Sequence, residues 1–261
     1  MAKSNNGIVR WDEEMAKEAA VAAGMEESAA TGQFFSTAGG QLKWNDAPLP
    51  DNQMAVVILD HVLENVFYEG AYDPDEISGP ACFAFGRDER EMAPHANVVA
   101  VGTQQSEKCA DCENNEWGSS DKGRGKACRN TRRLAMVPAG QFKDGKFVLN
   151  TSAEHYKTTQ VGYLRLPVTS VKGFAAFVKQ VAGALKRPPA GVATRVKVVP
   201  DSKTQFKVTF EPLAELPASL IPAVMSRRKE VSELISFPYQ PREEAATPKK
   251  GKKSNGKSKR Y

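Results

Sequence analysis

Short runs in which hydrophobic and polar positions alternate predict a mainly β protein. The longest apolar run extends from Met54 to Gly70 and is rich in Val, Ile, Phe and Tyr. These residue types favour one long strand, bent near residues 60–64, over a helix. Shorter strands are expected over 81–85, 97–103, 133–137, 147–149 and 162–166.

Turn signals and helical spacing complete the pattern. Apolar residues alternate over 192–198 and again over 206–210, on either side of a turn at 200–202, which predicts the clearest hairpin of the chain. A short hairpin is expected around Phe35 and 42–44. Helices are expected over 12–30, 169–185 and 217–235, with Thr169 and Ser170 as N-cap candidates of the second helix.

One helix set among five or more strands suits a small β-barrel. We therefore expect a mainly β fold with flanking helices (α+β), built as an OB-like, partly open β-barrel that carries an inserted loop. The expected organisation is an N-terminal helical arm (1–32), the barrel (33–214) with its cysteine-containing loop (about 82–133), a C-terminal helix (215–239) and a disordered basic tail (240–261).

The charge of the chain is concentrated in two segments. The net charge is +5, and seven basic residues with no acidic ones lie between Lys249 and Arg260, so subtracting them leaves residues 1–248 at about −2. Elsewhere the basic residues cluster chiefly from Lys122 to Arg133, which is the local footprint expected for an anionic polymer. The tail is either a flexible nucleic-acid arm or a solubilising end.

The apolar content excludes some classes of protein. No run of about 18 apolar residues is present, so we expect no membrane span. The N-terminal residues lack the apolar core of a signal peptide. The expected location is therefore the cytoplasm, where thiols stay reduced and clustered cysteines favour metal over disulfides.

Four cysteines form a C-x26-C-x2-C-x15-C array: Cys82, Cys109, Cys112 and Cys128. The central CxxC pair presents two thiolates to one ion, and the outer pair can complete a tetrahedral zinc site. We expect one structural Zn²⁺, because four thiolates leave no open position for a catalytic water. Two alternatives remain open, namely four buried thiols without a metal and His95 as a ligand in place of one cysteine.

The segment around the last cysteine is rich in Gly, Ser, Lys and Arg, which suits contact with phosphate better than burial. It is not a P-loop, because Ala127 follows Gly125 and Lys126 where Ser or Thr is required. Its basic side chains predict salt-sensitive contacts to a nucleic-acid backbone, with a merely solvated loop as the alternative. The candidate contacts are Lys122, Arg124, Lys126, Arg129, Arg132 and Arg133.

Aromatic residues near this loop supply candidate stacking positions. Bases stack on exposed rings with little regard to sequence. Trp117 and Tyr72 lie among polar residues and are the predicted stacking rings, whereas aromatics within strands more often belong to a core. No GxSxG or HExxH motif and no carboxylate pair accompanies the histidines, so we expect a binding protein rather than an enzyme.

The order VVILDHVLENVFYEGAYD, GPACFAF, CADCENNEWGSSDKGRGKACRNTRRLAMV and TSVKGFAAFVKQVA resembles zinc-containing OB-fold single-stranded DNA-binding proteins of bacteriophages. The similarity covers about residues 33–215 and is most specific from Cys109 to Leu134. It implies that the four cysteines hold zinc, that the barrel groove binds single strands, and that the protein coats DNA in phage replication or recombination. Many such coat proteins end in an acidic, partner-recruiting tail, whereas this tail is basic.

The predicted function is therefore sequence-tolerant binding of single-stranded DNA in the bacterial host cytoplasm, with phage replication or recombination proteins as partners. One alternative is a zinc-containing phage transcription or host-takeover factor that acts through protein contacts. Another is an accessory subunit of a nuclease or recombinase. The DNA or RNA preference and the oligomeric state are left open by the sequence.

Overall fold

The structure is a computed structural model that describes Met15 and residues 34–70, 79–121 and 123–239. Except for Met15, the expected N-terminal helix and the basic tail lie outside the described residues. Two candidate site residues, Lys122 and Tyr72, also lie outside them.

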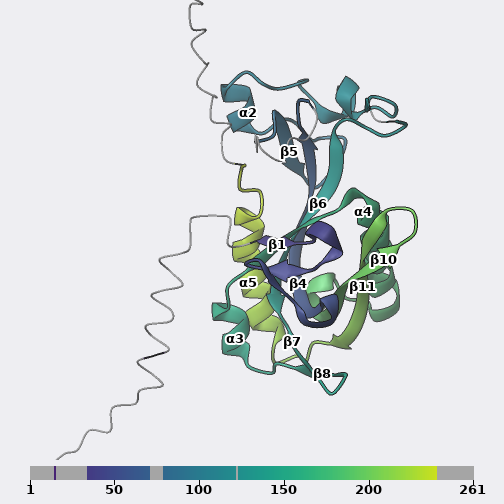
Figure 1. The fold of residues 1–261 in the computed structure, drawn as a ribbon. Helices are drawn as coiled ribbons and strands as arrows, with labels where there is room; N and C mark the ends of the chain where they lie inside the picture. Colours follow the sequence, from purple (N-terminus) through teal and green to yellow (C-terminus); the bar gives the residue numbers. More distant parts are fainter. Residues whose placement is uncertain (1–14, 16–33, 71–78, 122, 240–261) are drawn as a thin grey trace, which may run out of the picture.

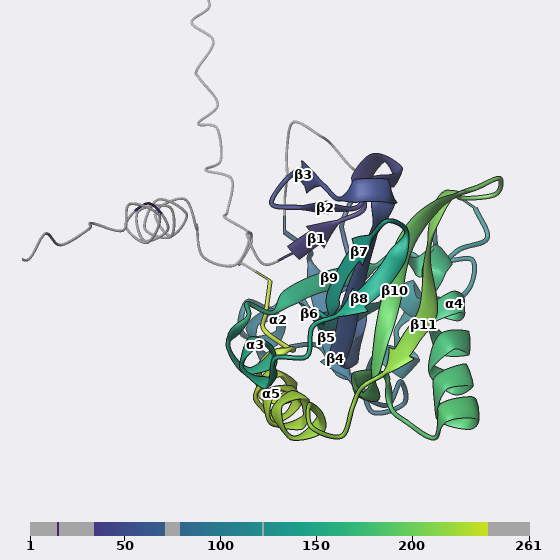
Figure 2. The ribbon, with the colours of Figure 1, turned by 90° about the horizontal axis from the view of Figure 1, so that it is seen from below.

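A curled sheet forms the centre of a mainly β fold with a few helices (Figure 1; Figure 2). Its strands pair in the order β11-β10-β4-β6-β9-β1-β2-β3, and β5 pairs with β4 beside this path. The strands are β1 (Phe34–Ser36), β2 (Lys43–Trp44), β3 (Ala47–Pro48), β4 (Gln53–Phe67), β5 (Cys82–Gly86), β6 (Arg129–Pro138), β9 (Gly162–Leu166), β10 (Val192–Asp201) and β11 (Gln205–Glu215). A separate hairpin joins β7 (Gly140–Lys143) to β8 (Lys146–Leu149).

The α-helices between residues 34 and 239 in the described part of the chain are α2 (Ala96–Ala100), α3 (Ala153–Thr158), α4 (Val168–Gln180) and α5 (Ile221–Leu234). The prediction of a strand over 97–103 is wrong. These residues open as a helix because the His95 ring caps it, with Nδ1 accepting from the N–H of Asn97 at 3.1 Å. No helix in the described part of the chain is long and apolar enough to cross a membrane.

The bend expected in the long strand is a β-bulge. The pairing of β4 with β6 skips one residue between Ile58 and Asp60, which leaves Leu59 unpaired. A bulge inverts the alternation of side chains, because successive residues point to opposite faces. Before the bulge Ile58 packs with the core on the α4 side, and after it His61 lies against Phe174 of α4, with ring centroids 5.1 Å apart.

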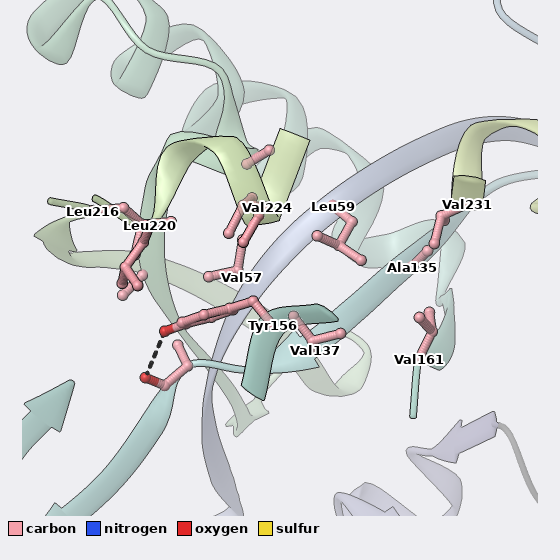
Figure 3. Packing of buried hydrophobic residues seen from close by; sticks show 14 of the residues in the cluster. Val57, Leu59, Ala135, Val137, Tyr156, Val161, Leu216, Leu220, Val224 and Val231 are labelled. Carbon is pink, nitrogen blue, oxygen red and sulfur yellow. Dashed lines mark hydrogen bonds between the residues drawn. The ribbon is translucent and has the colours of Figure 1, made fainter. Parts of the chain in front are cut away.

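Both faces of the central strands are covered. On one face Val56, Leu134 and Leu164 pack against Phe174 and Phe177 of α4. On the other face Val57 and Val137 pack against α3 and α5, and Figure 3 shows Tyr156 of α3 lying among these valines and Val224 of α5. The Tyr156 hydroxyl lies 2.9 Å from the carbonyl of Asn150, which satisfies its polar end.

The strands β4 and β6 continue beyond this body and carry a second, smaller lobe. The first half of β4 pairs with β10 (Gln53 to Val57), and its second half pairs with β5 (Leu63 to Phe67). The lobe contains β5, α2 and the cysteine loop, and it stands above the body in Figure 1. Its small apolar cluster contains Ala84, Met92 and Cys109.

Candidate nucleic-acid interface and metal centre

The four cysteines converge in the smaller lobe. Cys82 opens β5, Cys109 opens a 3-10 turn (Cys109–Asp111), Cys112 separates that turn from the next one (Glu113–Asn115), and Cys128 directly precedes β6. All four are free thiols, and all four line one small cavity of about 20 Å³. Sequence spacing alone could not bring Cys82 to the CxxC pair; the pairing of β5 with β4, and of β4 with β6, does so.

The thiols lie close enough to influence one another. Burial raises the pKa of Cys128 to about 12, and the neighbouring cysteines add to the rise. Burial and the same neighbours also raise the pKa of Cys109. A divalent cation among them would offset the repulsion between thiolates, so this donor set fits a tetrahedral S4 zinc site.

The four cysteines line the same cavity, but they do not form a coordination sphere. Among residues 34–70, 79–121 and 123–239, no group of three or more His, Cys, Asp or Glu side chains is placed so that it could hold a metal ion. A shared cavity requires only that the side chains point to one place, whereas ligation requires bonding distances to a single ion. The zinc site is therefore a proposal that rests on convergence.

His95 does not share the cysteine cavity. Its ring stacks on Phe83, with centroids 5.1 Å apart and an interplanar angle of 27°. Its Nδ1 is engaged as the cap of α2. The cavity is lined by all four cysteines but not by His95, so the cysteine set is the better candidate.

The loop between Cys112 and Cys128 is held by its own hydrogen bonds. The Cys128 N–H donates to the carbonyl of Asn114 at 2.7 Å, and the Asn115 amide donates to the carbonyl of Cys109 at 2.7 Å. Gly118, with φ of +95°, donates its N–H to the carbonyl of Gly125 at 3.0 Å. These bonds fix the loop on the cysteine cluster, so its side chains are presented from an ordered frame.

One cation–aromatic contact lies within this loop, and a second lies directly after it. The Trp117 side chain is 79% exposed, and the Lys126 ammonium lies 6.0 Å from the centroid of its ring. Arg129 is exposed and lies 5.5 Å from the centroid of the Tyr68 ring. Arg124 is exposed as well. Trp117 is thus an open ring beside a cation, whereas the Tyr68 ring is half-buried.

The other two predicted phosphate contacts, Arg132 and Arg133, are much less exposed than Arg124 and Arg129. Arg132 is mostly buried and pairs with Glu89 at 3.2 Å. Arg133 is 1% exposed, and its Nη2 lies 2.6 Å from Oε1 of Glu64, which is fully buried. The prediction of a phosphate contact by Arg133 is therefore wrong, because this guanidinium is enclosed beneath the C-terminal end of α5 and donates to the carbonyl of Phe237.

Sequence reasoning missed Arg165 of β9. Arg165 lies directly opposite Arg133 on the neighbouring strand, an arrangement of like charges that normally destabilises a sheet. The two guanidiniums share the single carboxylate of Glu64, with Arg165 Nε at 3.5 Å from Oε2. Arg165 also lies 4.5 Å from the ring centroid of Tyr239 and keeps 39% of its side chain exposed. The sequence feature that could have identified Arg165 is a cationic residue inside an otherwise apolar strand.

Together Arg165, Arg129 and Tyr68 form what we call the arginine face, on the side of β6 and β9 next to the cysteine lobe. Tyr68 contacts Arg129, and its hydroxyl is among the groups that raise the pKa of Arg165, after Glu64 and Tyr239. The face carries an excess of positive charge, because Glu64 can balance only one of its two guanidinium partners.

Comparison of the chain with protein-family models, with curated proteins and with solved structures found no match. These comparisons show neither a family nor a function for the chain.

Proposed function

We propose that this protein binds single-stranded DNA with little sequence preference, through phosphate contacts and base stacking. The observation that carries the proposal is Trp117, a large ring that is 79% exposed, beside Lys126 on an ordered loop. Tryptophan is highly buried on average in folded proteins, so a ring this exposed is available for contact with a ligand. Stacking on a base is the use that its cationic surroundings favour.

An OB-like barrel is the finer description of the fold that we propose. Five of the strands pair in the order β11-β10-β4-β6-β9, and α4 lies between the third and fourth of them in the chain. No ladder joins β9 to β11 in the described residues, since β9 pairs with β1 instead, so such a barrel is open. The cysteine lobe is inserted between the first two strands, where OB folds carry a ligand-binding loop.

The proposed zinc has a structural role. Cys82, Cys109, Cys112 and Cys128 would hold one Zn²⁺ and thereby fix the loop that presents Trp117 and Lys126. Such an ion contributes folding free energy and performs no step with the ligand. The resemblance to phage coat proteins supports the same assignment, together with action in the host cytoplasm and partners in replication or recombination.

The nucleic-acid class is tested by titrating labelled oligo-dT, oligo-U and a duplex of equal length at two salt concentrations. We expect tight binding to oligo-dT that weakens steeply with salt, and much weaker binding to duplex. Equal affinity for duplex, or no binding to either, would overturn the proposal. Oligo-U decides whether the protein distinguishes DNA from RNA.

Single substitutions locate the interface. Trp117→Ala should weaken binding to oligo-dT by about 5- to 100-fold without changing the salt slope, because it removes stacking only. Arg129→Gln should weaken binding and reduce the salt slope by about 0.7. Lys179→Gln, at an exposed lysine of α4, serves as the matched control. Equal losses in Arg129→Gln and in the lysine control would show a non-specific charge effect.

The zinc proposal has its own readout. Metal analysis of the purified protein should give about one zinc ion per chain, and Cys112→Ser should lower the melting temperature. A metal-free wild type that is as stable as the variant would contradict the site.

A second candidate function is contact with another protein through the cysteine lobe. Val99 and Val101, at α2, are 51% and 66% exposed. This apolar pair favours the transcription-factor or host-takeover alternative if the wild type binds neither single strand nor duplex.

A further inference from the structure

A cavity of about 570 Å³ lies among β1, β2 and β7 and is used by none of the contacts above. Its walls include Phe35 and Trp44, which face each other across β1 and β2 with ring centroids 4.4 Å apart and planes at 41°. Phe142 of β7 adds a third ring from a different element. An aromatic lining of this kind suits a flat, unsaturated ligand.

The cavity is shaped in advance by two backbone features. A Cβ on Gly162 would overlap the Phe35 ring and lie 2.9 Å from the Trp44 ring, so only glycine lets both rings lie against β9. On the rim, Asp51 and Asn52 both have positive φ, at 52° and 58°. The Asn52 side chain holds this strained turn by accepting from the N–H of Leu42 and donating to the carbonyl of Gly40, each at 2.7 Å.

The polar lining indicates what kind of ring would enter. The amides of Gln53 and Gln141 offer donors and acceptors together, which matches the edge of a heterocycle and not a hydrocarbon chain. Asp51 is the one charged side chain among the described lining residues, so a phosphate would be repelled from the cavity. The ligand must therefore be neutral within the cavity and keep any phosphate outside it.

The cavity and the arginine face are formed in part by the same strand, β9, but the Phe34 and Phe35 side chains that neighbour them point to opposite faces of the sheet. The ring of Phe34 lies 5.9 Å from Arg165, while the next residue, Phe35, lines the cavity. Arg165 also stands three residues from Gly162 on β9. The cavity therefore lies about 10 Å along β9 from Arg165 and on the other face of the sheet, so the base that enters it is not the one next to a phosphate held by Arg165.

We propose that this cavity receives a nucleobase of the bound single strand, stacked on Trp44 and Phe35 with its polar edge toward Gln53 and Gln141. The inference rests on the proposed function, which it extends from backbone contact to capture of one base. It adds Trp44 and the two glutamines to the interface, and it predicts a modest preference among bases.

The test isolates Trp44 as a reporter. The chain contains three tryptophans, so Trp11→Phe combined with Trp117→Phe leaves Trp44 alone. Oligo-dT and oligo-dA are titrated into this protein while Trp44 emission and the anisotropy of a label on the oligonucleotide are recorded. We expect saturable quenching of Trp44 at the concentrations that give the anisotropy change.

Two substitutions complete the test in the wild-type background. Trp44→Leu should weaken binding by about 5- to 100-fold with an unchanged salt slope, because stacking releases no counterions. Gln141→Leu, at an exposed position and so compatible with folding, should change the ratio of oligo-dA to oligo-dT affinity at least about threefold. Val148→Ala, on the same hairpin but outside the cavity lining, is the control.

The outcomes separate the two proposals. If the anisotropy reports binding while Trp44 emission and both variants stay unchanged, the cavity holds no base and the single-strand function stands. If the wild type gives no anisotropy change with any oligonucleotide, the proposed function itself is overturned.

Discussion

At the scale of single residues, Glu64 decides how the charged centre is arranged. It is fully buried, accepts from Arg133, and also accepts from the Tyr239 hydroxyl at 2.7 Å. Its Oε2 atom and the Nε of Arg165 are buried without a hydrogen bond in the described structure. One carboxylate thus binds the C-terminal segment to the sheet while leaving Arg165 incompletely paired.

Removal of the Glu64 charge should be strongly destabilising. Glu64→Gln would leave the buried Arg133 without its counter-ion, and breaking a buried pair from one side costs about 3–5 kcal/mol. Denaturant unfolding measures the loss. Asp88→Asn removes the exposed pair with Arg90 and should leave stability unchanged. If both variants lose the same free energy of unfolding, the buried pair between Glu64 and Arg133 stabilises the protein no more than the exposed pair does.

A second buried carboxylate predicts acid sensitivity. Burial opposes the ionisation of Asp60, but hydrogen bonds from Arg87, at 2.6 and 3.1 Å, hold its pKa below the ordinary value of 3.8. The ionised pair therefore contributes stability above pH 3.8, and this contribution is lost as the pH falls through the lower folded value.

Unfolding curves measured between pH 5 and the acid limit would show this loss in the wild type. Asp60→Asn should reduce the pH dependence of the free energy of unfolding in that pH range. A variant curve parallel to that of the wild type would contradict the assignment to Asp60.

At the scale of elements, α4 is fastened to the sheet by a polar contact as well as by phenylalanines. The sequence suggested Ser170 as an N-cap, but α4 begins at Val168 and the Ser170 hydroxyl instead accepts from the N–H of Val208 on β11 at 2.8 Å. Ser170 is 2% exposed, so this bond satisfies a buried backbone donor of a distant strand.

Substitution at this contact tests how α4 is held. Ser170→Ala leaves the N–H of Val208 buried and unpaired, which costs about 1–3 kcal/mol in the free energy of unfolding. Thr169→Ala, one residue earlier and exposed, is the control and should change stability little. Equal effects of both substitutions would indicate a helix-propensity effect instead.

At the scale of the whole molecule, the body and the cysteine lobe have separate cores. The two large clusters contain none of the cysteines, whereas the small cluster includes Cys109. The lobes are joined mainly by β4 and β6, which run through both (Figure 1). Loss of order in the lobe therefore need not unfold the body.

Removal of the proposed zinc tests this division. After treatment with a strong chelator, hydrogen exchange should rise in peptides that cover 105–128, while peptides from β10 and β11 keep their protection. Loss of protection in both regions would mean that the metal supports the whole fold. Unchanged exchange everywhere would mean that no metal orders the loop.

The sequence by itself determined the local features of this protein. Alternation over 192–210 and the apolar run after Met54 predicted strands that the structure contains, because side-chain direction depends only on neighbouring residues. The array of four cysteines and the basic loop were equally visible.

Only the tertiary structure decided which side chains face a ligand. Arg133 and Arg129 belong to the same basic run, yet one is enclosed by Glu64, 69 residues away in the chain, and the other is exposed. The bulge at Leu59, the opposition of Arg165 to Arg133 and the cavity beside Trp44 all depend on strand register. Register is set by contacts between distant segments, and no local pattern contains it.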